Sequence, residues 1–149
     1  MKYTQAQAGR IFILRLEHGD VVTETIQNFA QEHNIRSAYV QIVGGADKNS
    51  RIVVGPKDGL AEKPEKVYLE TEAVSEMFGV GTIFTNESGE AKLHLHASFG
   101  RGNKANTGCC WPGVKTWHIG EVIIHELISQ KTKRKHNTQN GFELLEIED

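Results

Sequence analysis

The sequence predicts an α/β protein of the α+β type, with a single, mostly antiparallel or mixed β-sheet and one main helix packed on it. Most apolar residues fall in short runs that alternate with polar residues, which is typical of half-buried strands. Only one segment has clear helical spacing. Turn residues separate the runs, and Asn86-Glu87-Ser88-Gly89 predicts a hairpin connection.

The expected elements begin with a strand from Arg10 to Leu16, followed by a turn at His18-Gly19-Asp20. A helix comes next, with Asp20 as its N-cap and Asn34 as a left-handed stop. The positions at helical spacing are Val22, Ile26, Phe29, Ala30 and His33. Further strands are expected at Ala38 to Val43, Arg51 to Val54, Lys66 to Glu72, Met77 to Thr85, Ala91 to Phe99, Trp117 to Ile128 and Phe142 to Ile147.

Length and composition indicate one domain over residues 1–149, since 149 residues with 38% hydrophobic content suffice for one core. The net charge of −2 argues against the broad cationic surface that non-specific nucleic-acid binding requires. The two cysteines are adjacent, so reduced thiols are expected. The N-terminus is polar, and no apolar stretch approaches the ~20 residues needed to cross a bilayer. Together with the reduced thiols, this predicts a cytoplasmic protein that does not span a membrane.

The stretch KLHLHASFGR places two histidines on the polar face of a predicted strand. Residues two apart on a strand point the same way, and roughly 7 Å separates them. His94 and His96 can therefore lean onto one metal ion, although a single histidine on such a face is more often an ordinary surface residue. Two ligands alone do not hold zinc, so a third must come from elsewhere.

Cys109 and Cys110 supply the missing ligand type, because they follow the histidine strand after a short glycine-rich stretch that can fold back over it. Zinc accepts imidazole and thiolate, and three protein ligands leave a fourth position for water, substrate or a neighbouring subunit. The alternative is that both cysteines are buried small hydrophobes. His118 is a rival ligand, ranked lower because a lone histidine at a strand end is more often a surface or supporting residue.

The segment Gly100-Arg101-Gly102-Asn103-Lys104-Ala105 fits the glycine pattern of dinucleotide-binding folds. The residues that follow have no helical period, so no helix N-terminus is available for a pyrophosphate. We therefore reject a nucleotide site.

The run from Lys131 to His136 is the one basic cluster of the sequence. We expect it to form a solvated hairpin tip, since lysines are normal at turns and flanking carboxylates nearly cancel the charge. A phosphate or nucleic-acid contact is the alternative.

Several stretches together resemble the plants-and-prokaryotes conserved domain, the PPC domain, over nearly the whole chain. They are LRLEHGDVVTETIQNFAQEHNIRSAYVQIVGGAD, HLHASFGR and TGCCWPGVKTWHIGEVIIHEL. In many relatives the loop after His-x-His reads Gly-Gly-His-Leu-x-x-Gly, so the third histidine of the family falls on Cys109 here. The resemblance thus implies a metal site of His94, His96 and Cys109, with zinc as the expected ion. It aligns Cys110 with an apolar position, which favours packing over ligation.

The resemblance also implies a homotrimer. Independently, the stretch EVIIHELI carries apolar residues on both faces, which one helix cannot cover. In plant relatives the domain accompanies AT-hooks, short Arg-Gly-Arg segments that enter the minor groove of DNA. This chain has no such hook, so we expect little DNA binding by this domain alone.

Three functions are compatible with the sequence. We favour a small cytoplasmic domain that self-associates and carries zinc for a ligand or partner, such as a small molecule. The second is a metal-dependent enzyme in which zinc lowers the pKa of a bound water to about 7, with Glu121 as general base. The third is a DNA-binding regulator that uses the basic run.

Overall fold

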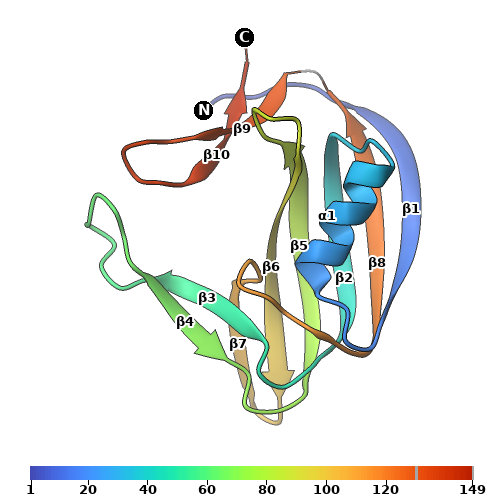
Figure 1. Cartoon of the computed structure of the whole chain (residues 1–149), viewed down its shortest axis with the longest axis vertical. Coiled ribbons are helices and arrows are strands. Elements are labelled where there is room, and N and C mark those ends of the chain that lie inside the picture. Colours follow the sequence, from blue (N-terminus) through green and yellow to red (C-terminus); the bar gives the residue numbers. More distant parts are fainter. Residues whose placement is uncertain (130, 149) are drawn as a thin grey trace.

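The structure, a computed structural model, describes residues 1–129 and 131–148. Eight strands form one antiparallel sheet in the order β1-β8-β2-β5-β6-β7-β3-β4 (Figure 1). These strands are β1 (Gln7–Glu17), β2 (Ser37–Ala46), β3 (Arg51–Pro56), β4 (Lys66–Glu70), β5 (Ser75–Thr85), β6 (Ala91–Arg101), β7 (Lys104–Cys109) and β8 (Thr116–Ile128). The helix α1 (Val22–Glu32) packs on this sheet, and β9 (Thr132–His136) and β10 (Glu143–Ile147) form a separate hairpin. The predicted fold class is confirmed.

Two strands were not expected from the sequence, β7 and β9. The residues of β7 (KANTGC) show no alternation of apolar and polar side chains, and five of the six residues are half-buried or exposed. Its strand conformation comes from pairing with β6, a tertiary contact that overrides weak local propensity. The predicted hairpin tip at Lys131 to His136 is wrong, because Thr132–His136 pairs with β10.

Helix α1 begins differently from the prediction. Val21 occupies the N-cap position and makes no side-chain capping bond, so Asp20 is not the N-cap. The Asp20 carboxylate instead accepts a hydrogen bond of 2.8 Å from the Glu17 backbone N–H, which closes the turn after β1. The predicted stop is confirmed, since Asn34 has φ 55° and lies in the left-handed region.

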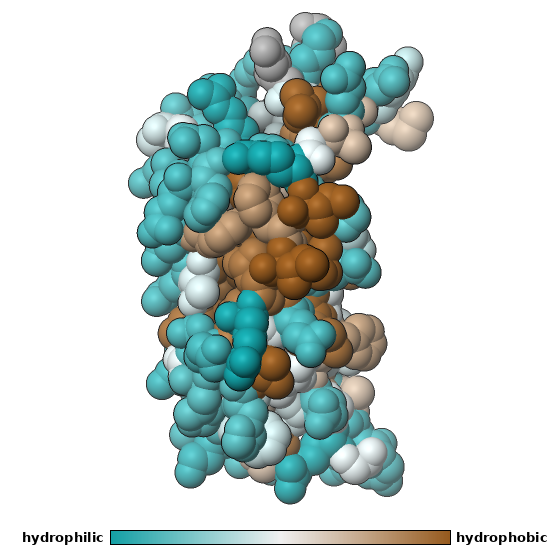
Figure 2. Space-filling view, turned by 90° about the vertical axis from the view of Figure 1, so that its right-hand side faces the viewer, coloured by the Kyte–Doolittle hydropathy of each residue, from teal (hydrophilic) through white to brown (hydrophobic). Residues whose placement is uncertain are grey.

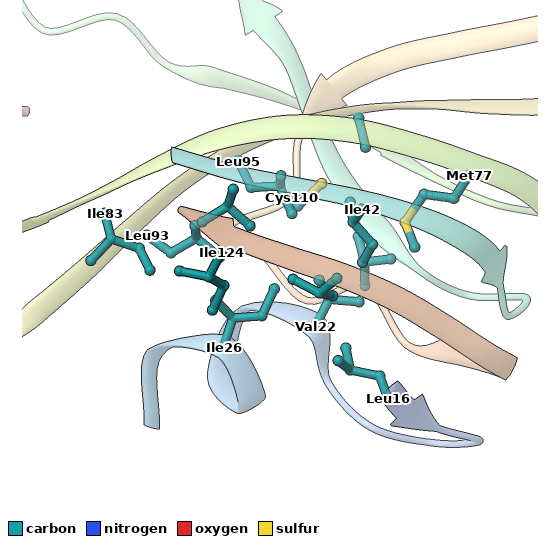
Figure 3. Close-up of a cluster of buried hydrophobic side chains, with 14 of the residues drawn as sticks. Leu16, Val22, Ile26, Ile42, Met77, Ile83, Leu93, Leu95, Cys110 and Ile124 are labelled. Atoms are coloured by element: carbon teal, nitrogen blue, oxygen red, sulfur yellow. The ribbon is translucent and has the colours of Figure 1, made fainter. Parts of the chain in front are cut away.

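The hydrophobic core lies between α1 and one face of the sheet, as Figure 3 shows for Val22 and Ile26 of the helix against Ile124 and Leu93. Val22, Ile26 and Ile124 are fully buried. Burial of side chains of this size stabilises the fold by about 1.5–3 kcal/mol each. A helix as short as α1 is barely stable alone, so packing against the sheet is what stabilises it. In the described residues no helix has the length and apolar character needed to span a bilayer.

The opposite face of the sheet, called here the open face, lacks a covering helix in the part of the chain that the structure describes. It carries exposed apolar side chains, with Ile13 81% and Phe78 68% accessible to solvent. Figure 2 shows such a hydrophobic patch, framed by hydrophilic residues, on the side of the molecule where β1 lies. Further residues of the open face are Val43, Val80 and Ile123.

The β9–β10 hairpin covers one end of the open face. Phe84 of β5, on that face, is only 8% exposed, and Arg134 of β9 lies with its guanidinium carbon 5.8 Å from the Phe84 ring centre. The Ser37 hydroxyl of β2 is 3.0 Å from the Thr132 hydroxyl of β9. The hairpin therefore docks over the ends of β2 and β5.

Candidate metal centre

Strand β6 presents both histidines of the predicted site on the open face. Leu93, Leu95 and Ala97 are buried, whereas His94 and His96 between them are exposed. The alternation read from the sequence thus matches the structure over this strand. Strand β6 lies between β5 and β7, and His96 has Val80 on one side and Cys109 on the other.

Strand β7 brings Cys109 to the same face. It returns antiparallel to β6 after the turn at Arg101 to Lys104, and in this register Cys109 lies directly opposite His96. The metal-binding atoms of His94, His96 and Cys109 all lie within 4.8 Å of one another. No other group of three potential ligands meets in the described residues, so the structure assembles the three residues that the sequence singled out.

The geometry of this cluster fits a tetrahedral metal ion. Nitrogen ligands about 2.0–2.1 Å from zinc lie about 3.3 Å apart, and a nitrogen and a sulfur ligand about 3.6 Å apart. The Nε2 atoms of His94 and His96 are 3.1 Å apart, with the two rings nearly perpendicular at 86°. The three ligand atoms lie within 4.8 Å of one another, so a bound ion would draw the side chains closer together. The mixed imidazole and thiolate set is one that zinc prefers.

The electrostatic surroundings favour a neutral imidazole at His94. Loss of water around the ring lowers its pKa below the ordinary value, and the nearby charges of His96 and Arg134 lower it further. A neutral ring presents a lone pair to a metal ion, whereas a protonated ring cannot. His94 is therefore ready to ligate at neutral pH.

Cys110 points away from this cluster into the core. It is fully buried, and its backbone N–H donates to the Leu95 carbonyl oxygen at 2.9 Å. Burial raises the pKa of the Cys110 thiol to about 12, and the charge of Cys109 adds to this effect. Cys110 stays a protonated, packed side chain, as its alignment with an apolar position suggested.

His118 and Glu121 lie away from the cluster. His118 adopts φ 58°, its ring is 6.1 Å from that of His18, and its backbone N–H donates to His18 Nδ1. Glu121 of β8 is on the open face, but β2 and β5 separate β8 from β6, which amounts to roughly 14 Å at the usual strand spacing. Glu121 is thus not placed to serve the cluster of its own chain as a general base.

Arg134 lies beside the cluster, and its position there was not predicted from the sequence. It sits in the basic run expected to be solvated, yet only 7% of its surface is exposed. Its Nη2 donates to the hydroxyl of Thr82, which lies opposite His94 in the β5–β6 register. Its place depends on how the β9–β10 hairpin docks, and no local pattern in the sequence reports that contact.

Comparisons with known proteins agree with this fold. A metal-containing protein from Archaeoglobus fulgidus has a TM-score of 0.81 and 23% identity, over 97% of this chain and 98% of that one. A plant- and prokaryote-conserved (PPC) protein from Pyrococcus horikoshii has a TM-score of 0.83 and 22% identity, over 98% and 97%. A candidate DNA-binding protein from Ralstonia eutropha has a TM-score of 0.68 and 20% identity, over 91% and 90%. At such identities the likeness is one of fold.

No curated protein matches the chain. The family model of the Plants and Prokaryotes Conserved (PCC) domain matches residues 3–128, which span β1 to β8 and include His94, His96 and Cys109. The chain belongs to the Plants and Prokaryotes Conserved domain family.

Proposed function

We propose that the chain is a small cytoplasmic domain that self-associates and holds a zinc ion between His94, His96 and Cys109 for a ligand or partner. The observation that carries the proposal is the meeting of these three ligand atoms within 4.8 Å. A structural neighbour described as metal-containing supports it. The free state of both cysteines is consistent with a reducing compartment.

The test is the zinc content per chain of the purified protein and of the double variant His94→Ala/His96→Ala. We expect about one zinc per chain in the unchanged protein and none in the variant, because one remaining thiolate does not retain zinc. The double variant His18→Ala/His118→Ala is a matched control, since it also removes two neighbouring imidazoles. Unchanged zinc content in His94→Ala/His96→Ala would refute the site.

Self-association is proposed from the open face. One row of directly opposite residues crosses this face from Ile123 of β8 through Gln41 and Val80 to His96 and Cys109. The exposed apolar surface is therefore continuous with the candidate metal centre. Contact between copies of the chain would bury this surface. The assembly that we propose is a homotrimer. Contact through the open face would then place a neighbouring subunit beside each metal centre.

DNA binding is the weaker alternative, although structural neighbours from Ralstonia eutropha and Bacteroides thetaiotaomicron are named as candidate DNA-binding proteins. Arg134 of the basic run is buried, and Lys135 forms a 3.4 Å salt bridge with Glu148. Little cationic surface remains there for phosphates. A gel-shift titration at physiological salt that gave submicromolar binding, lost when Lys131, Lys133 and Lys135 are neutralised, would favour this alternative.

A further inference from the structure

Arg134 is a buried cation whose hydrogen-bonding capacity is only partly used. Its surface is 7% exposed, and its Nε has no hydrogen-bond partner among the described residues. The two other contacts are long, 3.4 Å from Nη1 to the Glu143 carbonyl oxygen and 3.3 Å from Nη2 to the Thr82 hydroxyl. Both acceptors are neutral. A guanidinium offers five N–H groups, so this one can bind a further acceptor.

The charge of Arg134 is also not matched by an ion pair. None of the salt bridges among the described residues includes Arg134. Desolvation by burial lowers the pKa of Arg134, and the nearby charge of Glu143 offsets this effect only in part. Burying a guanidinium without a counterion is unfavourable, so such a residue indicates a place for an anion.

A hydrogen bond and the strand register place Arg134 beside the candidate metal centre. Thr82, which it contacts, is the direct cross-strand neighbour of His94. The β9–β10 hairpin, which lies beyond the family match at residues 3–128, thus brings a cation to a site built within that match.

We propose that Arg134 and the metal centre together bind an oxyanion, a carboxylate or phosphate group of a small molecule, with Arg134 donating hydrogen bonds to it. The planar guanidinium suits both groups, because each can accept two parallel N–H bonds. This inference rests on the proposed zinc site and adds the chemical class of its ligand. It assigns to the β9–β10 hairpin the role of completing the metal centre with a cation.

The test uses the full chain loaded with Co²⁺ in place of zinc, whose visible absorption changes when an anion enters the coordination of the metal. Acetate and inorganic phosphate are titrated separately, to distinguish a carboxylate from a phosphate site, and chloride is the reference anion. We expect at least one of the two oxyanions to bind. Arg134→Gln should weaken that binding at least about tenfold, the effect of losing a charge-assisted hydrogen bond.

Lys133→Gln is the matched control, because it removes the same charge from the next residue of β9. It should leave the affinity for the oxyanion within about twofold, because successive side chains of a strand point to opposite faces, so Lys133 points away from the side of β9 that carries Arg134. Equal affinity in Arg134→Gln and Lys133→Gln would overturn the proposal, and so would a lack of binding by either oxyanion. Metal content is measured in the same samples: absence of metal from the unchanged chain refutes the zinc site, whereas retained metal with unaltered oxyanion binding refutes only the role of Arg134.

A second measurement does not depend on the variant folding. Crystals of the metal-loaded chain soaked in the oxyanion that binds should show it within hydrogen-bonding distance of the Arg134 guanidinium. An anion bound at the metal but away from Arg134 would contradict the proposal.

Discussion

Cys109 and Cys110 are adjacent in the sequence but have opposite environments. Cys109 is half-buried on the open face beside His96, whereas Cys110 is fully buried in the core. Burial keeps Cys110 protonated, with a pKa raised to about 12, and a thiol is a poor zinc ligand. The chain thus allows a direct comparison of a candidate ligand cysteine with a packing cysteine.

Substitution of each cysteine should separate metal binding from stability. Cys109→Ala is expected to lose zinc on dialysis against a chelator, and Cys109→His, the residue expected in many relatives, is expected to retain it. Cys110→Ala should retain zinc and lower the free energy of unfolding by about 1–3 kcal/mol, the usual range for a core substitution. Zinc analysis and urea unfolding provide both readouts. Loss of zinc from Cys110→Ala alone would reverse the assignment.

A second residue-level contact joins β1 to β8. The Glu126 carboxylate accepts hydrogen bonds from Arg10 at its Nε and Nη2, both 2.8 Å, and from its backbone N–H at 3.1 Å. The Arg10 side chain is the main cause of a lowered pKa at Glu126. A lowered pKa in the folded state means that the ionised carboxylate favours folding.

The contribution of Glu126 should therefore depend on pH in a defined direction. It is present above the ordinary pKa of 4.5 and is lost as pH falls through the lowered folded-state pKa, because protonation then removes the charge. We expect Glu126→Gln to be less stable than the unchanged chain at pH 7, with the difference shrinking at pH 3. Glu17→Gln, from the exposed Arg15–Glu17 pair, is the control. Urea unfolding at both pH values that gave a constant difference for Glu126→Gln would contradict this account.

At the scale of elements, the strand that carries the histidines is held close to β5 by two glycines. A Cβ at Gly79 would lie 2.7 Å from the His96 carbonyl oxygen, and a Cβ at Gly81 would lie 2.6 Å from the His94 carbonyl oxygen. Both distances are too short for any other residue without a shift of backbone. The glycines of β5 thus fix the position of the His-bearing backbone.

Gly81→Ala should disturb both the sheet and the metal centre. We expect a loss of about 1–3 kcal/mol in unfolding free energy, typical of overpacking, together with weaker zinc retention, because β6 must move at His94. Gly100→Ala in β6 is the control, since a Cβ there meets nothing within 4 Å. Equal stability and equal zinc affinity in the two variants would show that β5 and β6 can separate without consequence.

Elements with a strong periodic pattern were predictable, and elements that depend on docking were not. β6 and α1 follow from apolar spacing, because one face of each is buried against the core. β7 and β9 have no such pattern, and they are strands because partner strands lie beside them. The same difference applies to the site: the alternation placed His94 and His96 on one face, while the buried position of Arg134 follows only from where the hairpin lies.

At the scale of the whole molecule, self-association would explain why the open face carries exposed apolar side chains. Phe78 and Val80 of β5 are 68% and 52% exposed, next to the β6 face that carries the histidines. Light scattering at micromolar concentration should give a mass near three times the 16.6 kDa of one chain. A mass near that of one chain would refute self-association, and a mass near twice that value would refute the three-fold arrangement.

A charge placed on this face should dissociate the assembly. Phe78→Asp is expected to shift the measured mass toward that of one chain, since an ionised carboxylate is unfavourable in an apolar interface. Leu60→Asp is the control, because Leu60 is 97% exposed in the segment between β3 and β4. If both variants keep the mass of the unchanged chain, the open face is not the interface.

The most direct test of the zinc site is a crystal structure of the purified chain with diffraction data collected on both sides of the zinc absorption edge. We expect one anomalous peak per chain, about 2.0–2.3 Å from His94 Nε2, His96 Nε2 and Cys109 Sγ. A peak at another group of side chains, or no peak between these three in crystals grown with zinc, would contradict it.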